Sequence, residues 1–568
     1  MTFLPLLLSA LLLPASAQAQ AGPEGDPVLK ALRAELDRDF QGLKSAEKVP
    51  LYFLAYELRD TRTFDLSADL GGLKTESEHR YRTLDVDVRV GDPRFDNTHQ
   101  IKGRESWNDW SPTVRTEVSS DDDPDALRAD AWLRTEEAFK SAVKRFEKVK
   151  TNKAITASEE DDSDDFSKEP PASFYEKAEL PKADAEDWKG RLKRLSAAMK
   201  DYPFVYDSGI SLSARAENRY ILNSEGTSVV TGNVYLRLSY HLSSRTEDGL
   251  DLERYESYDG EVYADFPSEE KILADIRKSA AELEALRKAP LTEPYIGPAI
   301  IKNRAAGVYF HEIMGHRFEG HRQKMEDEGQ TFKKMLGKPV TASFISVYDD
   351  PTLKRQGKTF LRGAYRYDDE GVAPSRLTLI EDGVLRNFLM SRMPIKGFPN
   401  SNGHARRSAG NDVVPRMGNT VVVASVTVPY DQLRVQLIEE VKRQNKPYGL
   451  VFEDISGGFT MTNRYMPQSF KVIPLLVYRV YPDGRPDEPV RGVDIVGTPL
   501  TSFTKIIAAA DDVDVFNGSC GAESGWVPVS GVAPSILFSE LEVEKKEKSS
   551  EKPPLLPPPY QDDKGGRK

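Results

Sequence analysis

The chain of 568 residues contains one cysteine, Cys520, so no internal disulfide can hold it together. Its stability has to come from a hydrophobic core, and its length allows two domains of ordinary size. The thiol itself has two interpretations. It is either a buried, inert side chain or a metal ligand, and a metal bond would protect it from oxidation.

The first residues have the pattern of an export signal. Residues 3–13 form an apolar run broken only by Pro5 and Ser9, and a small-x-small pattern follows up to Ala19. This is typical of a secretory signal peptide at 1–19, and we expect a periplasmic or secreted protein. A membrane anchor is the alternative. The run is shorter than the roughly 20 residues that span a bilayer, so we expect no membrane span.

The net charge of −12 argues against a nucleic-acid partner, because a protein that binds phosphates needs a basic face. The pattern of the chain predicts an α+β protein in two parts. An N-terminal domain of mixed helices and sheet is expected at 27–290. A β-rich, barrel-like C-terminal domain is expected at 291–545, followed by a disordered, Pro-rich tail at 546–568.

Apolar residues at three- and four-residue steps predict helices in the first half, at 27–44, 125–149, 183–200 and 267–288. Alternating strands are expected at 51–56 and 82–88, and in a strand-rich stretch at 206–259. The acidic run 158–165 is expected to be a solvated loop. A calcium site is the alternative there, although the spacing and the glycine of an EF-hand are absent.

The second half is expected to consist mainly of short strands and tight turns. The clearest pair is a hairpin of 377–380 and 384–389 around the turn Glu381-Asp382-Gly383. Helices are few in this half, with one expected at 430–444 and another at 500–510.

A helix with two histidines is the strongest chemical signal in the chain. His311 and His316 are five residues apart, which places them about 140° apart on an ideal helix, too far to share an ion. A one-residue π-bulge near Gly315 would bring them onto one face. The pair therefore belongs either to a π-bulged metal helix or to two unrelated histidines.

Two imidazoles and one thiolate, from His311, His316 and Cys520, would form a three-ligand metal set that leaves a position open for water. Glu312, beside the first histidine, stands where a water-activating base is needed. Glu319 is a candidate third ligand or a hydrogen-bond acceptor behind a histidine. His321 is expected on the surface. This set predicts a metal-dependent hydrolase, and two nitrogens with a sulfur favour zinc.

Several short motifs of the second half occur in the order found in the TldD/PmbA family of bacterial peptidases, which the chain resembles over 300–545. The motifs are Ala306-Gly307-Val308, HEIMGHRFEG at 311–320, DDEG at 368–371, LIEDGVL at 379–385, NGHARR at 402–407, Pro415-Arg416-Met417, GSCG at 518–521 and Val527-Pro528-Val529. The first half resembles the family only in its general order of helices and strands.

The resemblance implies a zinc peptidase with one zinc per chain. It assigns His311, His316 and Cys520 as the ligands and Glu312 as the catalytic base, and it leaves Glu319 in a supporting position. It also implies that the substrates are unfolded peptides. Family members often pair with a related subunit that lacks the metal residues, so we expect a homodimer or a heterodimer.

The loop at 403–407 is the predicted substrate-binding segment. Its two arginines, Arg406 and Arg407, could hold a peptide carboxylate or carbonyl groups, and a solvated basic turn is the alternative. His404, Arg406 or a backbone N–H are the candidate donors to the oxyanion of the reaction.

The predicted function is therefore hydrolysis of peptide bonds in unfolded peptides or proteins by metal-activated water, with Glu312 as general base. The main alternative is a non-catalytic, zinc-binding assembly subunit of a peptidase-like complex, marked by Glu319 as a fourth ligand. A scaffold without metal and an enzyme with Cys520 as catalytic thiol are the remaining alternatives.

Overall fold

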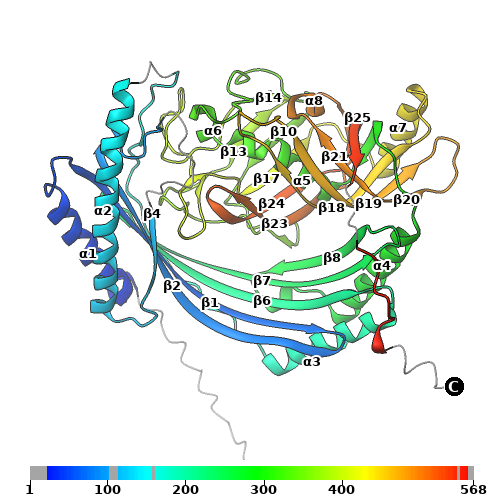
Figure 1. The fold of residues 1–568 in the computed structure, drawn as a ribbon, viewed down its shortest axis with the longest axis horizontal. Helices are drawn as coiled ribbons and strands as arrows, with labels where there is room; N and C mark the ends of the chain where they lie inside the picture. Colours follow the sequence, from blue (N-terminus) through cyan, green and yellow to red (C-terminus); the bar gives the residue numbers. More distant parts are fainter. Residues whose placement is uncertain (1–21, 102–112, 156–159, 547–550, 561–568) are drawn as a thin grey trace, which may run out of the picture.

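The computed structural model describes residues 22–101, 113–155, 160–546 and 551–560. The predicted signal peptide at 1–19 lies outside the described residues. Within them the protein is α+β, as predicted, and its two halves lie face to face (Figure 1). No helix in this part of the chain is both long and apolar enough to cross a membrane.

The first half is dominated by one sheet of long, curved strands. Its order is β3-β2-β1-β6-β7-β5, with β4 beside β2 and β8 beside β7. The turn between the two longest strands is Leu70-Gly71, where both residues have positive φ, and this matches the right-handed twist of a tight hairpin. The strands are β1 (Leu51–Asp69), β2 (Gly72–Asp92), β3 (Phe95–Asp96), β4 (Thr113–Val118), β5 (Ser173–Glu176), β6 (Asp207–Asn223), β7 (Ser228–Arg245) and β8 (Asp251–Gly260).

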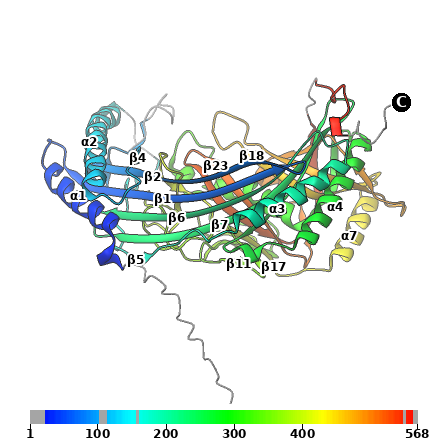
Figure 2. The same cartoon turned by 90° about the horizontal axis from the view of Figure 1, so that it is seen from below.

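Helices cover the sheet at its two ends, and each was predicted from the sequence. Helices α1 (Pro27–Leu43) and α2 (Pro124–Ile155) pack at one end, while α3 (Ala185–Ala197) and α4 (Glu269–Lys288) lie together at the other (Figure 2). Helix α1 begins sharply because the Asp26 side chain accepts hydrogen bonds from two free backbone N–H groups, and Pro27 needs none. The apolar faces of the four helices are buried in two separate clusters.

The second half contains a closed barrel, which confirms the predicted architecture. The ring runs β18-β9-β25-β21-β19 and closes because β19 also pairs with β18. Helix α7 (Tyr430–Arg443), which was predicted, covers the outside of the barrel. The barrel strands are β9 (Tyr295–Ile301), β18 (Gly449–Thr460), β19 (Phe470–Val480), β21 (Val493–Gly497) and β25 (Ile536–Lys545), with β20 (Glu488–Val490) and β22 (Ile506–Ala509) at its side.

A second sheet lies beside the barrel, in the order β14-β13-β10-β17-β24-β23. Helix α5 (Asn303–Ile313) is buried between this sheet and the barrel and contacts β18, β23 and β24. Strand β23 stands at the end of the sheet order. The strands are β10 (Ile345–Asp349), β13 (Leu377–Glu381), β14 (Val384–Leu385), β17 (Asn419–Ala424), β23 (Asp514–Ala522) and β24 (Gly525–Ala533).

Three sequence predictions need correction. The expected helix at 500–510 is only a short turn, α8 (Pro499–Phe503), because the following residues pair with β25 as a strand. The second arm of the predicted hairpin shrinks to Val384–Leu385. The described part of the acidic run is not fully solvated. Asp165 is buried against His99, and Asp161 is buried where it accepts backbone N–H groups.

The described part of the predicted tail, 551–560, runs back to the first half. Glu551 pairs with Arg245 at 2.7 Å, and Lys552 donates a hydrogen bond to the carbonyl of Glu247.

The two halves meet through buried ion pairs on the concave face of the long sheet. Arg407 reaches from the second half to Glu57 at 2.9 Å and to Asp87 at 2.9 Å. In return, Arg59 and Arg219 of the sheet both pair with Asp369. A buried charge is tolerated only when it is paired, so these contacts fix how the halves sit against each other.

Candidate metal centre

The two histidines are brought together by the end of a helix, and the expected π-bulge does not occur. Helix α5 ends at Ile313, and a 3-10 turn follows over Gly315–Phe318. The turn carries His316 back toward His311. A Cβ on Gly315 would overlap the Met417 sulfur, so this position needs glycine. Arg317 donates hydrogen bonds to the carbonyls of Glu312 and Ile313 and so satisfies the free end of the helix.

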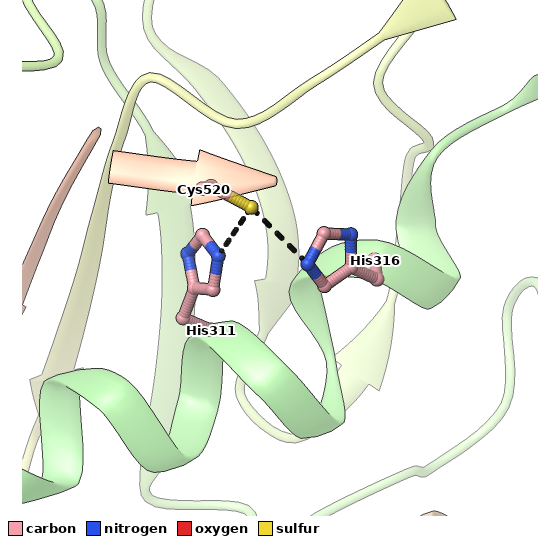
Figure 3. A group of neighbouring side chains, drawn as sticks. All are labelled: His311, His316 and Cys520. Carbon is pink, nitrogen blue, oxygen red and sulfur yellow. Dashed lines mark hydrogen bonds between the residues drawn. The ribbon is translucent and has the colours of Figure 1, made fainter. Parts of the chain in front are cut away.

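Cys520 completes a group of three possible metal ligands (Figure 3). It lies on β23, opposite the end of α5. Its Sγ is 2.9 Å from His311 Nε2 and 3.2 Å from His316 Nε2. All three side chains are buried, and their ligand atoms lie within 4.8 Å of one another. Cys520 is more than two hundred positions from either histidine in the chain, and the fold brings it next to both, as the sequence predicts.

The donor set fits a zinc ion. Zinc bound tetrahedrally by nitrogen and sulfur separates these atoms by about 3.5 Å, so the three side chains would need to move apart by only a few tenths of an ångström. The thiol is also prepared for ligation. Burial would raise the pKa of Cys520, but the positive charges of His316, His311 and Arg416 outweigh it and hold the pKa well below the usual value.

The ligands are held in place by a ring of neighbouring charges. Glu319 Oε1 lies 3.1 Å from His316 Nδ1, which leaves Nε2 of that ring facing Cys520. The Arg416 guanidinium donates hydrogen bonds to both Sγ and the carbonyl of Cys520, each at 2.9 Å. Arg322 pairs with Glu319 in turn. The carboxylate of Glu319 therefore contacts His316 on the side away from Cys520 and pairs with Arg322 and Arg416.

Glu312 faces open space beside the ligands. It is 9% exposed, and among the described residues none donates a hydrogen bond to its carboxylate. Burial raises its pKa above the usual value, against the pull of His311 and His316. A Cβ on Gly458 would lie 2.8 Å from Glu312 Cγ, so the glycine on β18 makes room for this side chain.

The ligands and Glu312 lie in the wall of a cleft of about 820 Å³. One side of the cleft is formed by residues 456–460 of β18, and the other by residues 519–522 of β23. In the described structure β23 pairs on one side only, with β24, so an unpaired strand edge borders the cleft. The arrangement offers a metal site, a carboxylate base and a backbone edge in one cavity.

The predicted substrate-binding residues lie elsewhere. His404 is fully buried with its Nε2 3.3 Å from Asp349 Oδ1, and it lines neither of the two large cavities. Arg407 is fully buried in the contact between the halves. Arg406 lines a second cavity, adjacent to the metal cleft. His321, expected on the surface, is fully buried because its Nε2 contacts Glu523 Oε1 at 2.5 Å.

Sequence reasoning missed Arg416, Arg322 and Glu523 as parts of the site. Arg416 belongs to the motif Pro415-Arg416-Met417, which marked the segment but not the contact with Cys520. The motif also contains Met417, which packs on Gly315.

Comparisons with known proteins relate this chain to metalloproteases. Residues 294–545 match the model of the PmbA/TldA metallopeptidase C-terminal domain. A metalloprotease TldD homolog from Haemophilus influenzae is 26% identical over 346 residues, which are 59% of this chain and 66% of that protein. A zinc metalloprotease TldD homolog from Saccharolobus solfataricus is 26% identical over 248 residues, 43% of this chain and 51% of the relative. The matches thus span between half and two thirds of these relatives.

The fold also has a solved counterpart. TldE from Thermococcus kodakarensis superposes with a TM-score of 0.58 at 14% identity, covering 90% of this chain and all of the other. The buried His-His-Cys set provides three protein ligands, the number that catalytic zinc sites use while one position stays open. The chain belongs to the TldD/PmbA family, whose relatives are named metalloproteases.

Proposed function

We propose that this protein is a zinc-dependent peptidase that hydrolyses peptide bonds of unfolded peptides. One observation carries the proposal. Three residues suited to zinc, from two distant segments, converge with Glu312 in the wall of a cleft large enough for an extended chain. His311, His316 and Cys520 would hold the ion. Zinc in such a set supplies Lewis acidity, which lowers the pKa of water to roughly 7 and polarises a carbonyl.

Glu312 serves as the proton carrier in this proposal. Its carboxylate takes a proton from the attacking water and delivers it to the amine that leaves. Its position suits this role, because the carboxylate lines the cleft beside the three candidate ligands without a hydrogen-bond donor among the described residues. Arg317 supports the position of Glu312 by binding the carbonyl at the same residue.

The substrate lies along a strand edge in this proposal. An extended peptide that pairs with β23 would run past Cys520 with its main chain hydrogen-bonded. Of the candidate oxyanion donors, His404 and Arg406 do not line the cleft, whereas the backbone of β18 and β23 does. We therefore assign the oxyanion contact to a backbone N–H. Recognition of unfolded chains follows, because a folded protein cannot present an extended segment to this edge.

Export and assembly are further parts of the proposal. The predicted signal peptide implies a periplasmic or secreted enzyme, which N-terminal sequencing of the mature protein in fractionated cells would test. The proposed assembly, a dimer with itself or with a related subunit, follows from the resemblance to the family. The mass of the native protein in solution measures that assembly.

The test of the function combines metal content with hydrolysis. We expect about one zinc per chain in wild type, measured by mass spectrometry after purification without chelators, and little zinc in Cys520→Ala. We expect wild type to cleave an unfolded peptide library that Glu312→Gln, with its zinc retained, leaves intact. Zinc in both proteins without cleavage by either would instead favour the non-catalytic assembly subunit.

A further inference from the structure

A second cavity, of about 510 Å³, lies between the two halves of the molecule. One wall is the concave face of β1, β6 and β7, and the other is formed by loops of the second half and by the hairpin of β23 and β24. The catalytic proposal makes no use of this cavity. Its lining has an unusual composition, with seven arginines and four acidic side chains among the described residues.

Most of these arginines are neutralised by partners, but two are not fully paired. Arg406 is 7% exposed and forms no ion pair with any described residue. Its guanidinium donates a hydrogen bond to the carbonyl of Met417 at 2.6 Å and lies over the ring of Tyr365. Both partners are uncharged. A buried cation with only neutral partners leaves part of its charge unbalanced.

Arg362 is the second incompletely paired cation. Its Nε is 3.8 Å from Asp259 Oδ1, but Arg237 already binds both oxygens of that carboxylate, at 2.7 and 2.9 Å. The Nε of Arg362 and the Nε of Arg219 are both buried without a hydrogen-bond partner among the described residues. With the Nε of Arg215, three arginines of the cavity lining thus keep a buried N–H group without an acceptor among the described residues.

The charges also disfavour one another. Burial lowers the pKa of Arg362 to about 10, and Arg237 adds repulsion. Burial likewise lowers the pKa of Arg406, and Arg416 is one of the cations that repel it. An anion placed between these guanidinium groups would relieve the repulsion and satisfy the free N–H groups in the fork geometry that arginine offers to carboxylates.

The cavity and the metal cleft share one lining residue. Trp526, on β24, lines both spaces and is 70% exposed. It pairs across the hairpin with Gly521, the residue next to Cys520. An extended chain advances about 3.3 Å per residue, so a peptide held at the metal reaches the second cavity within a few residues.

We propose that this cavity binds a carboxylate of the peptide substrate between Arg406 and Arg362, a few residues from the bond that is cleaved. The inference rests on the proposed peptidase function and adds a preference to it. The carboxylate belongs either to the C-terminus of the peptide or to a glutamate or aspartate side chain.

The test uses the zinc-loaded mature chain of Glu312→Gln, which would bind peptides without cleaving them. Three N-acetylated random peptide libraries are compared by ultrafiltration and mass spectrometry. The first is neutral, with an amidated C-terminus and no acidic residue. The second differs only in its free C-terminal carboxylate, and the third only in one internal glutamate. We expect at least one acidic library to be retained about tenfold more strongly than the neutral one. The library that gains identifies the source of the carboxylate.

Variants connect that preference to the cavity. Introduced into the Glu312→Gln chain, Arg362→Gln and Arg406→Gln should each remove most of the gain, and Arg406→Lys should keep part of it. Arg386→Gln, a half-exposed surface arginine paired with Glu381, is the matched control and should leave the preference unchanged. Arg362→Gln and the comparison of the libraries remain informative if substitution of the buried Arg406 prevents folding.

Equal retention of the three libraries by the parent protein, or an undiminished preference in folded Arg362→Gln and Arg406→Gln, would overturn the proposal. Hydrolysis of the libraries by the enzyme with Glu312 intact is measured separately. Stronger retention of an acidic library without any hydrolysis would overturn the peptidase function and leave the carboxylate site standing. Hydrolysis together with equal retention of the three libraries would overturn the carboxylate site and leave the peptidase function standing.

Discussion

The metal centre and the contact between the two halves both bury charged side chains, but they balance the charges differently. Between the halves, Arg407 binds Glu57 and Asp87 directly, and cations and carboxylates alternate. At the metal centre, His311, His316 and Arg416 surround a single thiolate, and Glu312 faces the cleft without a hydrogen-bond donor among the described residues. The first arrangement pairs most of its charges and holds the halves together. The second is open toward the cleft, which is what the proposed hydrolysis requires.

Arg407→Met should produce the largest change and tests the holding role. Removing one partner leaves Glu57 and Asp87 buried with less compensation, and such losses typically cost about 3–5 kcal/mol of stability. The free energy of unfolding, measured by denaturant titration, should fall by about this amount. Zinc content of the folded fraction should be unchanged, because Arg407 is absent from the lining of the metal cleft.

Arg386→Met is the control for this substitution. Arg386 is half exposed, and surface ion pairs contribute little, so its removal should change the free energy of unfolding by about 0.5 kcal/mol or less. If the two variants lost similar stability, the contact between the halves would not depend on Arg407.

Arg416→Lys should have the next largest effect and act on the metal centre alone. A lysine cannot reproduce the guanidinium that binds both Sγ and the carbonyl of Cys520 while also binding Ser524. Loss of such a partner behind a ligand typically weakens metal affinity by about 10- to 100-fold. Competition with a chelator measures the affinity. An unchanged zinc affinity in the folded variant would remove Arg416 from the site.

The comparison also shows what the sequence could reveal. The proximity of His311, His316 and Cys520 was predictable because two imidazoles, a thiol and a neighbouring glutamate together are typical of a metal site. The helices of the first half were predictable from their apolar spacing. By contrast, the path of the chain after Ile313 depends on Gly315 meeting Met417, a contact across about a hundred residues that no local pattern encodes.

The positions of the arginines in the fold were the hardest to predict from the sequence, for a physical reason. Arg406 and Arg407 are adjacent in the chain and looked alike, yet Arg406 has only uncharged partners whereas Arg407 is paired with carboxylates between the halves. An arginine is placed by the carboxylates it meets, and for Arg407 these are Glu57 and Asp87, far away in the first half. His321 was misplaced for the same reason, since its partner Glu523 comes from the distant turn between β23 and β24.

Asp85→Asn should have the smallest effect. It tests how completely the charges are balanced in the contact between the two halves. Asp85 is fully buried beside Arg407. Burial raises its pKa to about 6, and repulsion from Glu57 and Asp87 adds to this against the attraction of Arg407. The folded protein therefore holds this proton more tightly than the unfolded chain, whose aspartates have a pKa of about 3.9.

The direction of the pH effect follows from that difference. Well below pH 4 Asp85 is protonated in both states. As the pH rises from about 4 to above 6, the folded state loses up to about 3 kcal/mol of relative stability. An asparagine can still accept the hydrogen bond from Gly410 N but does not ionise. Between pH 4.5 and 7.5, Asp85→Asn should therefore gain about 1–2 kcal/mol relative to wild type in denaturant titrations. Asp382→Asn, in an exposed turn, should show no such gain. Parallel pH profiles of Asp85→Asn and wild type would mean that Arg407 neutralises Asp85 completely, and that the contact between the halves carries no residual cost of charge.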